Sequence, residues 1–177
     1  MICTAVVFQQ LNYVSEKHLG FDKENLLVLH HVEAVKNGET LANASMTVPG
    51  ATGVSWCSSV PPNIWGGDSF SAEGMNGNTF PLNYATGDEN YIPTLNIKLK
   101  FGRNFSINNP GDIHRVILNQ SAIEKIGWKM DESVIGKKVK YPNSDDVEFE
   151  VIGVVSDFNY WSIATPIEPM AIFHIKN

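Results

Sequence analysis

The sequence has little cysteine and little charge of either sign. Its 177 residues include two cysteines, Cys3 and Cys57, and only 18% are charged. Two cysteines without C-x-x-C spacing favour neither a disulfide scaffold nor a zinc or redox motif, although a single disulfide between them stays open. With 13 Lys and Arg against 19 Asp and Glu, and no basic run, the net charge of -6 argues against a nucleic-acid partner.

Long apolar runs are also missing. No stretch reaches the ~20 apolar residues of a membrane span, and no charged segment precedes a cleavage site, so we expect a soluble chain without a signal peptide. Residues 1–8 are nevertheless apolar. They are either an ordinary buried helix or strand, or the trailing end of a membrane helix.

The sequence lacks the common signatures of catalysis. It has no G-x-G-x-x-G and no Walker loop, so we expect no nucleotide or other cofactor. Ser55 is not in a nucleophile elbow, because Cys57 stands where the second glycine belongs. His30 and His31 point to opposite faces if they lie on a strand, which excludes joint metal binding. We expect no catalytic residue; a hydrolase would need Ser55 or Cys57 to meet a distant histidine.

The apolar content, 43% of residues, is sufficient for one domain at roughly 150 residues per domain. Helical spacing predicts a helix over residues 4–19, ended by Gly20. A strand at 26–29, a helix near 41–46 and a strand at 53–60 then form a β-α-β unit. From about 63 to 109 the sequence is rich in Gly, Asn and Ser, which predicts hairpins and a short helix near 91–95.

A second cycle follows Pro110. The pattern predicts a strand at 115–118, and a helix at 121–126 with Asn119 as its N-cap and Gly127 as its stop. Three strands come next, at 137–141, 147–155 and 170–175. The predicted fold class is α+β, with helices on one face of a mixed sheet.

Aromatic residues gather in the middle and near the end of the chain. Trp65 precedes a Gly-Gly pair, Phe70 and Phe80 follow, and Phe158, Tyr160 and Trp161 come after a strand. They either fill a second small core or form a surface for a partner, because aromatic rings supply large contact areas at low entropic cost. Sequence alone leaves both alternatives open.

The order of several short stretches resembles the extracytoplasmic core domain of ABC-transporter permeases of the MacB and FtsX type. The resemblance covers almost the whole chain. Its stretches are LGFDKENLL at 19–27, YIPTL at 91–95, GRNF at 102–105, VILNQSA at 116–122, IGKK at 135–138, VIGVVSDFN at 151–159 and PIEP at 166–169. Their glycines suit turns or close backbone approach, and none of the matched residues is catalytic.

The resemblance implies a particular division of the chain. Residues 1–24 would be a membrane-proximal stalk helix, with 1–8 as the outer end of a membrane helix, and 172–177 would approach a second one. A porter-like lobe of β-α-β units with a mixed sheet would comprise 25–62 and 113–177. A small β-rich, Sabre-like lobe at 63–112 would interrupt it.

The resemblance also implies a function without catalysis. Such a domain lies on the periplasmic side of the bacterial inner membrane and transmits conformational change, driven by a cytoplasmic ATPase, to an adaptor, lipoprotein, peptide or cell-wall hydrolase. The parent permease would be dimeric and the isolated domain monomeric. We expect Trp65, Phe70 and Phe80 to contact the partner. The alternative is a free-standing periplasmic domain that binds a peptide or lipid, which would require a ligand-sized pocket.

Overall fold

The computed structural model describes residues 17–30, 32, 38–64, 66–141 and 147–175. The predicted helix over 4–19 lies almost entirely outside these residues, as does Cys3. The helices are α2 (Gly38–Met46), α3 (Tyr91–Thr94) and α4 (Gln120–Ile126), with short 3-10 turns at Pro110–His114 and Glu132–Val134. The strands are β1 (Gly66–Ala72), β2 (Thr79–Gly87), β3 (Leu99–Gly102), β4 (Arg115–Asn119), β5 (Lys138–Tyr141), β6 (Val147–Val155) and β7 (Met170–His174).

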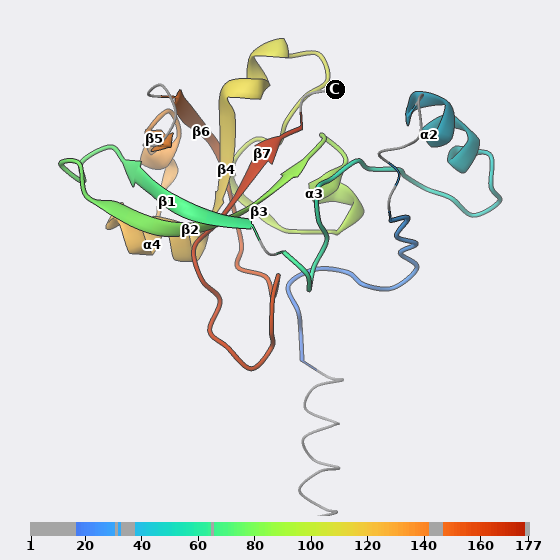
Figure 1. Ribbon diagram of the computed structural model, residues 1–177, viewed down its shortest axis with the longest axis horizontal. Coiled ribbons are helices and arrows are strands. Elements are labelled where there is room, and N and C mark those ends of the chain that lie inside the picture. Colours follow the sequence, from blue (N-terminus) through green and yellow to red (C-terminus); the bar gives the residue numbers. More distant parts are fainter. Residues whose placement is uncertain (1–16, 31, 33–37, 65, 142–146, 176–177) are drawn as a thin grey trace, which may run out of the picture.

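The described strands form one mixed sheet that closes on itself (Figure 1). Its order is β3-β6-β4-β7-β2-β1-β5, and β5 pairs back onto β6. Closure is possible because β6 is nine residues long. The first part of one β6 edge pairs with β5, at 147–150, and the last part pairs with β3, at 153–155. β3 therefore lies outside the ring formed by the other strands.

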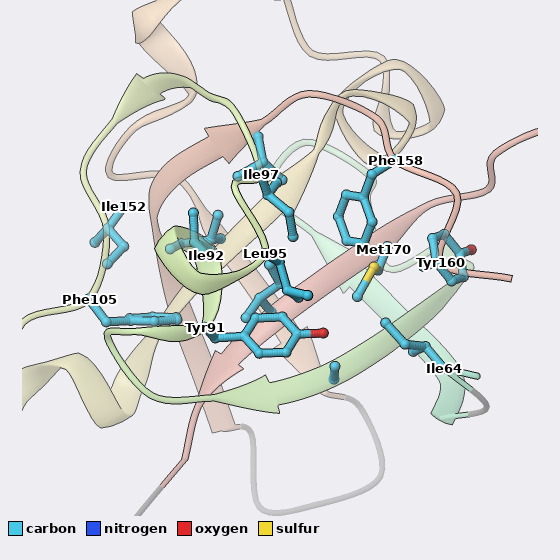
Figure 2. Close-up of a cluster of buried hydrophobic side chains, with 14 residues drawn as sticks. Ile64, Tyr91, Ile92, Leu95, Ile97, Phe105, Ile152, Phe158, Tyr160 and Met170 are labelled. Atoms are coloured by element: carbon cyan, nitrogen blue, oxygen red, sulfur yellow. The ribbon is translucent and has the colours of Figure 1, made fainter. Parts of the chain in front are cut away.

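Side chains on the two faces of this sheet form two apolar clusters. The inner cluster draws residues from every strand of the ring, including Phe70, Phe80 and Phe173. The outer cluster covers the opposite face of β2, β4, β6 and β7 and contains Ile64, α3 and residues of the segment after β6 (Figure 2). Alternation along β4 illustrates the division, because Val116 and Leu118 join the inner cluster while Ile117 joins the outer one.

Both faces of the sheet are buried, and a helix packs against each of them. α4 contributes Ala122 and Ile123 to the inner cluster, whereas α3 contributes Tyr91 and Ile92 to the outer cluster. The expectation of helices on one face is therefore wrong. A sheet that is apolar on both sides needs cover on each.

The local signals around α4 are confirmed. The Asn119 side chain accepts a hydrogen bond from the Ala122 N–H at 2.9 Å, as an N-cap does. Gly127 ends the helix in the left-handed conformation, with φ of 84°. Asn119 does more than cap, because its Oδ1 also accepts from the Met170 N–H at 2.9 Å and its Nδ2 donates to the Glu168 carbonyl at 2.9 Å.

The predicted strands at 26–29 and 53–60 are wrong. Residues 26–29 have no sheet partner in the described part of the chain, and Leu27 is 85% exposed. In the second segment only Cys57 makes an isolated antiparallel bridge, to Gly87. An apolar run becomes a strand only where another strand lies alongside it, and the described sheet offers neither segment a place. α2, which was expected between them, is present but lies apart from the sheet (Figure 1).

The predicted β-rich lobe at 63–112 does not form a sheet of its own. β1 and β2 pair with each other, but β1 also pairs with β5, and β2 pairs in parallel with β7 over Asn83–Gly87. These strands thus complete the ring with strands from the later part of the chain. The reason is the alternating burial of β2, which has apolar residues for both clusters, Leu82 inward and Ala85 outward.

Replacing Asn119 tests its contribution to stability. Asn119→Ala removes two accepted hydrogen bonds and one donated bond at a site that is 2% exposed, and it leaves the Met170 N–H unpaired. We expect a loss of about 2–4 kcal/mol in the free energy of unfolding, measured by urea denaturation. Asn109→Ala is the control, because Asn109 is exposed and caps the 3-10 turn at Pro110–His114 through one bond of 3.2 Å. It should cost about 1 kcal/mol or less. Equal losses of unfolding free energy in the two variants would contradict the stabilising role given to the three hydrogen bonds of Asn119.

Candidate functional site

The structure corrects the expected partner surface. Phe70 and Phe80 are each 2% exposed and belong to the inner cluster. They face each other across the β1–β2 pair, so both point to the same side of the sheet. The Phe70 ring packs 5.8 Å from that of Phe173 and 5.1 Å from that of Tyr141, measured between centroids. Trp65 lies outside the described residues, and the core alternative holds for Phe70 and Phe80.

The potential nucleophiles make structural contacts. The Ser55 hydroxyl donates to Asp88 at 2.6 Å, and the Trp56 N–H donates to the same carboxylate at 2.8 Å. Cys57 is a free thiol, and burial, together with the charge of Asp88, raises its pKa. A raised pKa keeps sulfur as the less reactive thiol at neutral pH. Asp88 therefore links the 55–57 segment to the end of β2 through these two hydrogen bonds.

Among residues 17–30, 32, 38–64, 66–141 and 147–175, no group of three or more His, Cys, Asp or Glu side chains is placed to hold a metal ion. Among these same residues, no helix is long and apolar enough to cross a bilayer.

The most organised polar region joins the start of the described chain to the β6–β7 loop, residues 156–169. These two segments lie side by side at one end of the molecule (Figure 1). The Asn159 N–H donates to the Leu19 carbonyl at 2.7 Å, and its Nδ2 donates to the same oxygen at 3.2 Å. Lys17 Nζ donates to the Ile163 carbonyl at 2.8 Å. We call this contact of residues 17–22 with the loop the N-terminal junction.

Gly20 allows the two segments to approach closely. Its φ of 81° is a left-handed conformation, and a Cβ built there would lie 2.7 Å from the Asp157 carbonyl oxygen and 2.8 Å from the Phe158 Cα. Both neighbours are backbone atoms that cannot rotate away. The position therefore requires glycine for space as well as for conformation.

Both ends of the β6–β7 loop are tied to the β4–α4 corner. At the start, Asp157 accepts from the Ser121 hydroxyl at 2.7 Å and from the Ser121 N–H at 3.0 Å. At the end, Asn119 binds the Glu168 carbonyl and the Met170 N–H. The loop thus links the N-terminal junction to the β4–α4 corner of the sheet.

A small cleft lies between β2 and this loop. Its volume is about 150 Å³, and its lining residues are Asn83, Phe158, Asn159, Tyr160, Trp161, Ser162, Thr165, Pro166, Ile167 and Glu168. Asn83 Nδ2 donates to the Tyr160 hydroxyl at 2.9 Å and to Glu168 Oε2 at 3.3 Å. We call it the acidic cleft. Sequence reasoning missed it because Asn83 and its partners are 77 and 85 residues apart; the Gly66-Gly67 pair and the cluster of aromatics near 160 were its local signals.

Solved structures share this fold. The periplasmic region of MacB from Actinobacillus actinomycetemcomitans matches with a TM-score of 0.52 and 22% identity, covering 76% of this chain and 53% of that chain. The extracellular domain of the noncanonic ABC-type transporter YknZ from Gram-positive bacteria matches with a TM-score of 0.50 and 17% identity, covering 77% of this chain and 61% of that one. The fold is thus one of periplasmic and extracellular domains of bacterial proteins.

The family follows from the sequence match. The family model of the MacB-like periplasmic core domain matches residues 3–174, and the chain belongs to this family. That places it among the periplasmic core domains of ABC-transporter permeases. No curated protein matches the chain. The chain spans between about half and three fifths of the length of the two solved structures.

Replacing Phe70 tests its position in the core. Phe70→Ala should lower the free energy of unfolding by about 3–5 kcal/mol, because it opens a cavity in the inner cluster. Ile107→Ala is the control, since Ile107 is 75% exposed, and it should cost less than about 0.5 kcal/mol. Urea denaturation of both variants provides the measurement. A Phe70 variant as stable as the unmodified protein would restore a surface role.

Replacing Gly20 tests the N-terminal junction. Gly20→Ala introduces a Cβ against backbone, whereas Gly50→Ala introduces the same backbone strain, at φ of 92°, with no atom within 4 Å. We expect the Asn159 amide to exchange its hydrogen at least about tenfold faster in the Gly20 variant, because its bond to Leu19 is weakened. Gly50→Ala should leave that exchange unchanged. Identical exchange in the two variants would mean that the junction does not need close approach.

Proposed function

We propose that this chain is the extracytoplasmic domain of a permease of the MacB/FtsX type and transmits an ATP-driven conformational change to a periplasmic partner. The N-terminal junction is the observation that carries the proposal. Residues 1–24 would serve as a stalk between the membrane and the domain. The stalk's last residues are bonded to the β6–β7 loop, which is in turn bonded to the β4–α4 corner.

The route through these contacts is short and consists of hydrogen-bonded groups. A shift of residues 17–22 would pull on the loop at Asn159 and Ile163. Asp157 and Glu168, at the two ends of the loop, would pass the displacement to Ser121 and Asn119. Because the sheet is closed, the strands would respond as one body. Such coupling needs packed elements and hydrogen bonds and no chemical step.

In the proposed assembly, this domain is one part of a larger membrane protein. The chain would work on the periplasmic side of the bacterial inner membrane, with the rest of the permease and a cytoplasmic ATPase. The parent would be a dimer held by its membrane segments, and the isolated domain a monomer. The periplasmic partner would be an adaptor, a lipoprotein, a peptide or a regulator of cell-wall hydrolysis.

Two rival functions have less support. A hydrolase would need Ser55 or Cys57 to meet a distant histidine; instead, Ser55 donates to the Asp88 carboxylate, and the raised pKa of Cys57 keeps it as the thiol. A free-standing domain for peptides or lipids would need a pocket of about 300–1,000 Å³ with free polar groups. The acidic cleft is smaller. A hollow of about 380 Å³ beside β1 has Glu73, Lys138, Lys140 and Glu148 as its charged lining residues, and both lysines pair with Glu148.

Fractionation of native cells tests the assignment to a permease. An antibody against this domain should detect a membrane-bound band several-fold heavier than 19.6 kDa, the mass of the chain. A soluble band near that mass would refute the permease and favour the free-standing binding domain.

Hydrogen exchange in the parent protein tests transmission. In membranes that contain the permease and its ATPase, ATP should change the exchange of amides in the β6–β7 loop. Gly20→Ala should reduce this change by at least about half, because it disrupts the contact of residue 20 with Asp157 and Phe158. Gly50→Ala should preserve it. If ATP acts on the loop equally in all three proteins, the junction is not the route.

A further inference from the structure

The acidic cleft has the size of one side chain. Its volume of about 150 Å³ lies below the range of drug-sized pockets. Its walls are partly apolar, with Ile167 and Pro166 on the loop and Trp161 at the surface, where this side chain is 37% exposed. A narrow cleft with such walls suits an aliphatic stem that ends in a polar group.

Two polar groups of the cleft, Glu168 and Tyr160, accept hydrogen bonds from Asn83. Glu168 is exposed, and its carboxylate offers about four acceptor positions, of which the Asn83 amide occupies one at 3.3 Å. The Tyr160 oxygen accepts from the same amide. Tyr160 lies at the rim of the outer cluster with its hydroxyl turned away from Met170 (Figure 2). The donor capacity of Asn83 is therefore used within the cleft, which leaves carboxylate acceptors for an incoming group.

The electrostatic field in the cleft is negative. Burial raises the pKa of Tyr160 to about 12; the Asn83 hydrogen bond opposes this rise, and the charges of Glu168 and Asp157 add to it. Neither carboxylate forms a salt bridge to a described lysine, arginine or histidine. Lys17 does bind the same loop, but through the Ile163 carbonyl, and Ile163 does not line the cleft.

Two further features show that the cleft is built into the fold. Asn159, which lines it, is 6% exposed, and its Oδ1 is buried without a hydrogen-bond partner in the described structure. On the opposite side, a Cβ on Gly67 would lie 2.9 Å from Asn83 Oδ1. The absence of a side chain at residue 67 therefore gives the Asn83 amide room to turn toward Tyr160 and Glu168.

We propose that the acidic cleft binds a single lysine or arginine side chain exposed on a protein partner. The methylene stem would pack against Trp161 and Ile167, and the cationic head would meet the Glu168 carboxylate beside the indole ring. This inference deepens the proposed function, because it names the chemistry of the partner. The cleft also lies in the loop that receives the stalk, so a bound partner would contact the segment that moves.

Titration of the isolated chain with small amides tests the cleft. N-acetyl-lysinamide should shift the NMR signals of the Asn83 side-chain amide, Tyr160 and the Trp161 indole, with a dissociation constant in the millimolar range. N-acetyl-norleucinamide is the matched neutral probe, with a similar aliphatic stem and no charge, and should shift them far less. Equal shifts with both amides, or none with either, would overturn the proposal.

Two variants test whether the Glu168 carboxylate is responsible for the binding of N-acetyl-lysinamide. Glu168→Gln should weaken the binding of N-acetyl-lysinamide about three- to fivefold, as expected for one partly exposed charge. Glu124→Gln, an exposed substitution on α4, should leave it unchanged. Unaltered binding by the Glu168 variant would refute the role of this group.

A separate experiment tests whether the cleft binds the ammonium group of a lipid headgroup instead of a protein side chain. Vesicles of phosphatidylethanolamine should leave the cleft signals in place. If the vesicles shift them and N-acetyl-lysinamide does not, the cleft recognises a lipid headgroup and the protein-partner proposal fails. These measurements use the isolated chain, so they are independent of the fractionation result that decides the permease assignment.

Discussion

The length of β6 determines how the sheet closes. Because β6 extends over nine residues, one of its edges accommodates β5 and β3 in succession, while its other edge pairs with β4. Pairing of β5 with both β6 and β1 then completes the ring. The inner cluster exists only within that ring, and the β6–β7 loop begins where β6 ends. A shorter β6 would leave the sheet open and the loop without its anchor.

The elements predicted correctly from the sequence are those whose signals are local. Asn119 and Gly127 mark the ends of α4 through hydrogen bonds within a few residues. The runs that became β4, β7 and the second half of β6 are apolar enough to be strands buried on both faces, and the first half of β6 alternates apolar and acidic residues. For such elements, local pattern and tertiary environment agree, and the prediction holds.

The failures share one cause, which is dependence on distant residues. The segments at 26–29 and 53–60 have strand-like composition, but the described sheet provides no ladder for the first and one bridge to the second. Phe70 and Phe80 were expected at the surface, yet ring closure through β5 turns them inward. The acidic cleft depends on Asn83 meeting a loop about 80 residues later. The hydrophobic pattern of the sequence does not show which distant residues come into contact.

The N-terminal junction and the acidic cleft occupy the same loop. Asn159 belongs to both, since it holds Leu19 and lines the cleft. If the position of residues 17–22 changes the affinity of the cleft for a partner, then binding of that partner must shift the position of residues 17–22 by the same coupling free energy. Under the proposed function, partner binding would therefore feed back on the stalk as strongly as the stalk acts on the partner.

Ring closure also reduces the number of strand edges that the sheet exposes to neighbouring molecules. β1 pairs with β5 only at Ser71 and Ala72, so part of that β1 edge has no strand partner in the described sheet. β3 lacks a strand partner along one whole edge, and it is only four residues long. Exposed lysines at 98 and 100 lie just before and within it. Short, lysine-bearing edges discourage strands of neighbouring molecules from adding on. This edge of β3 is thus protected against the addition of strands from neighbouring molecules.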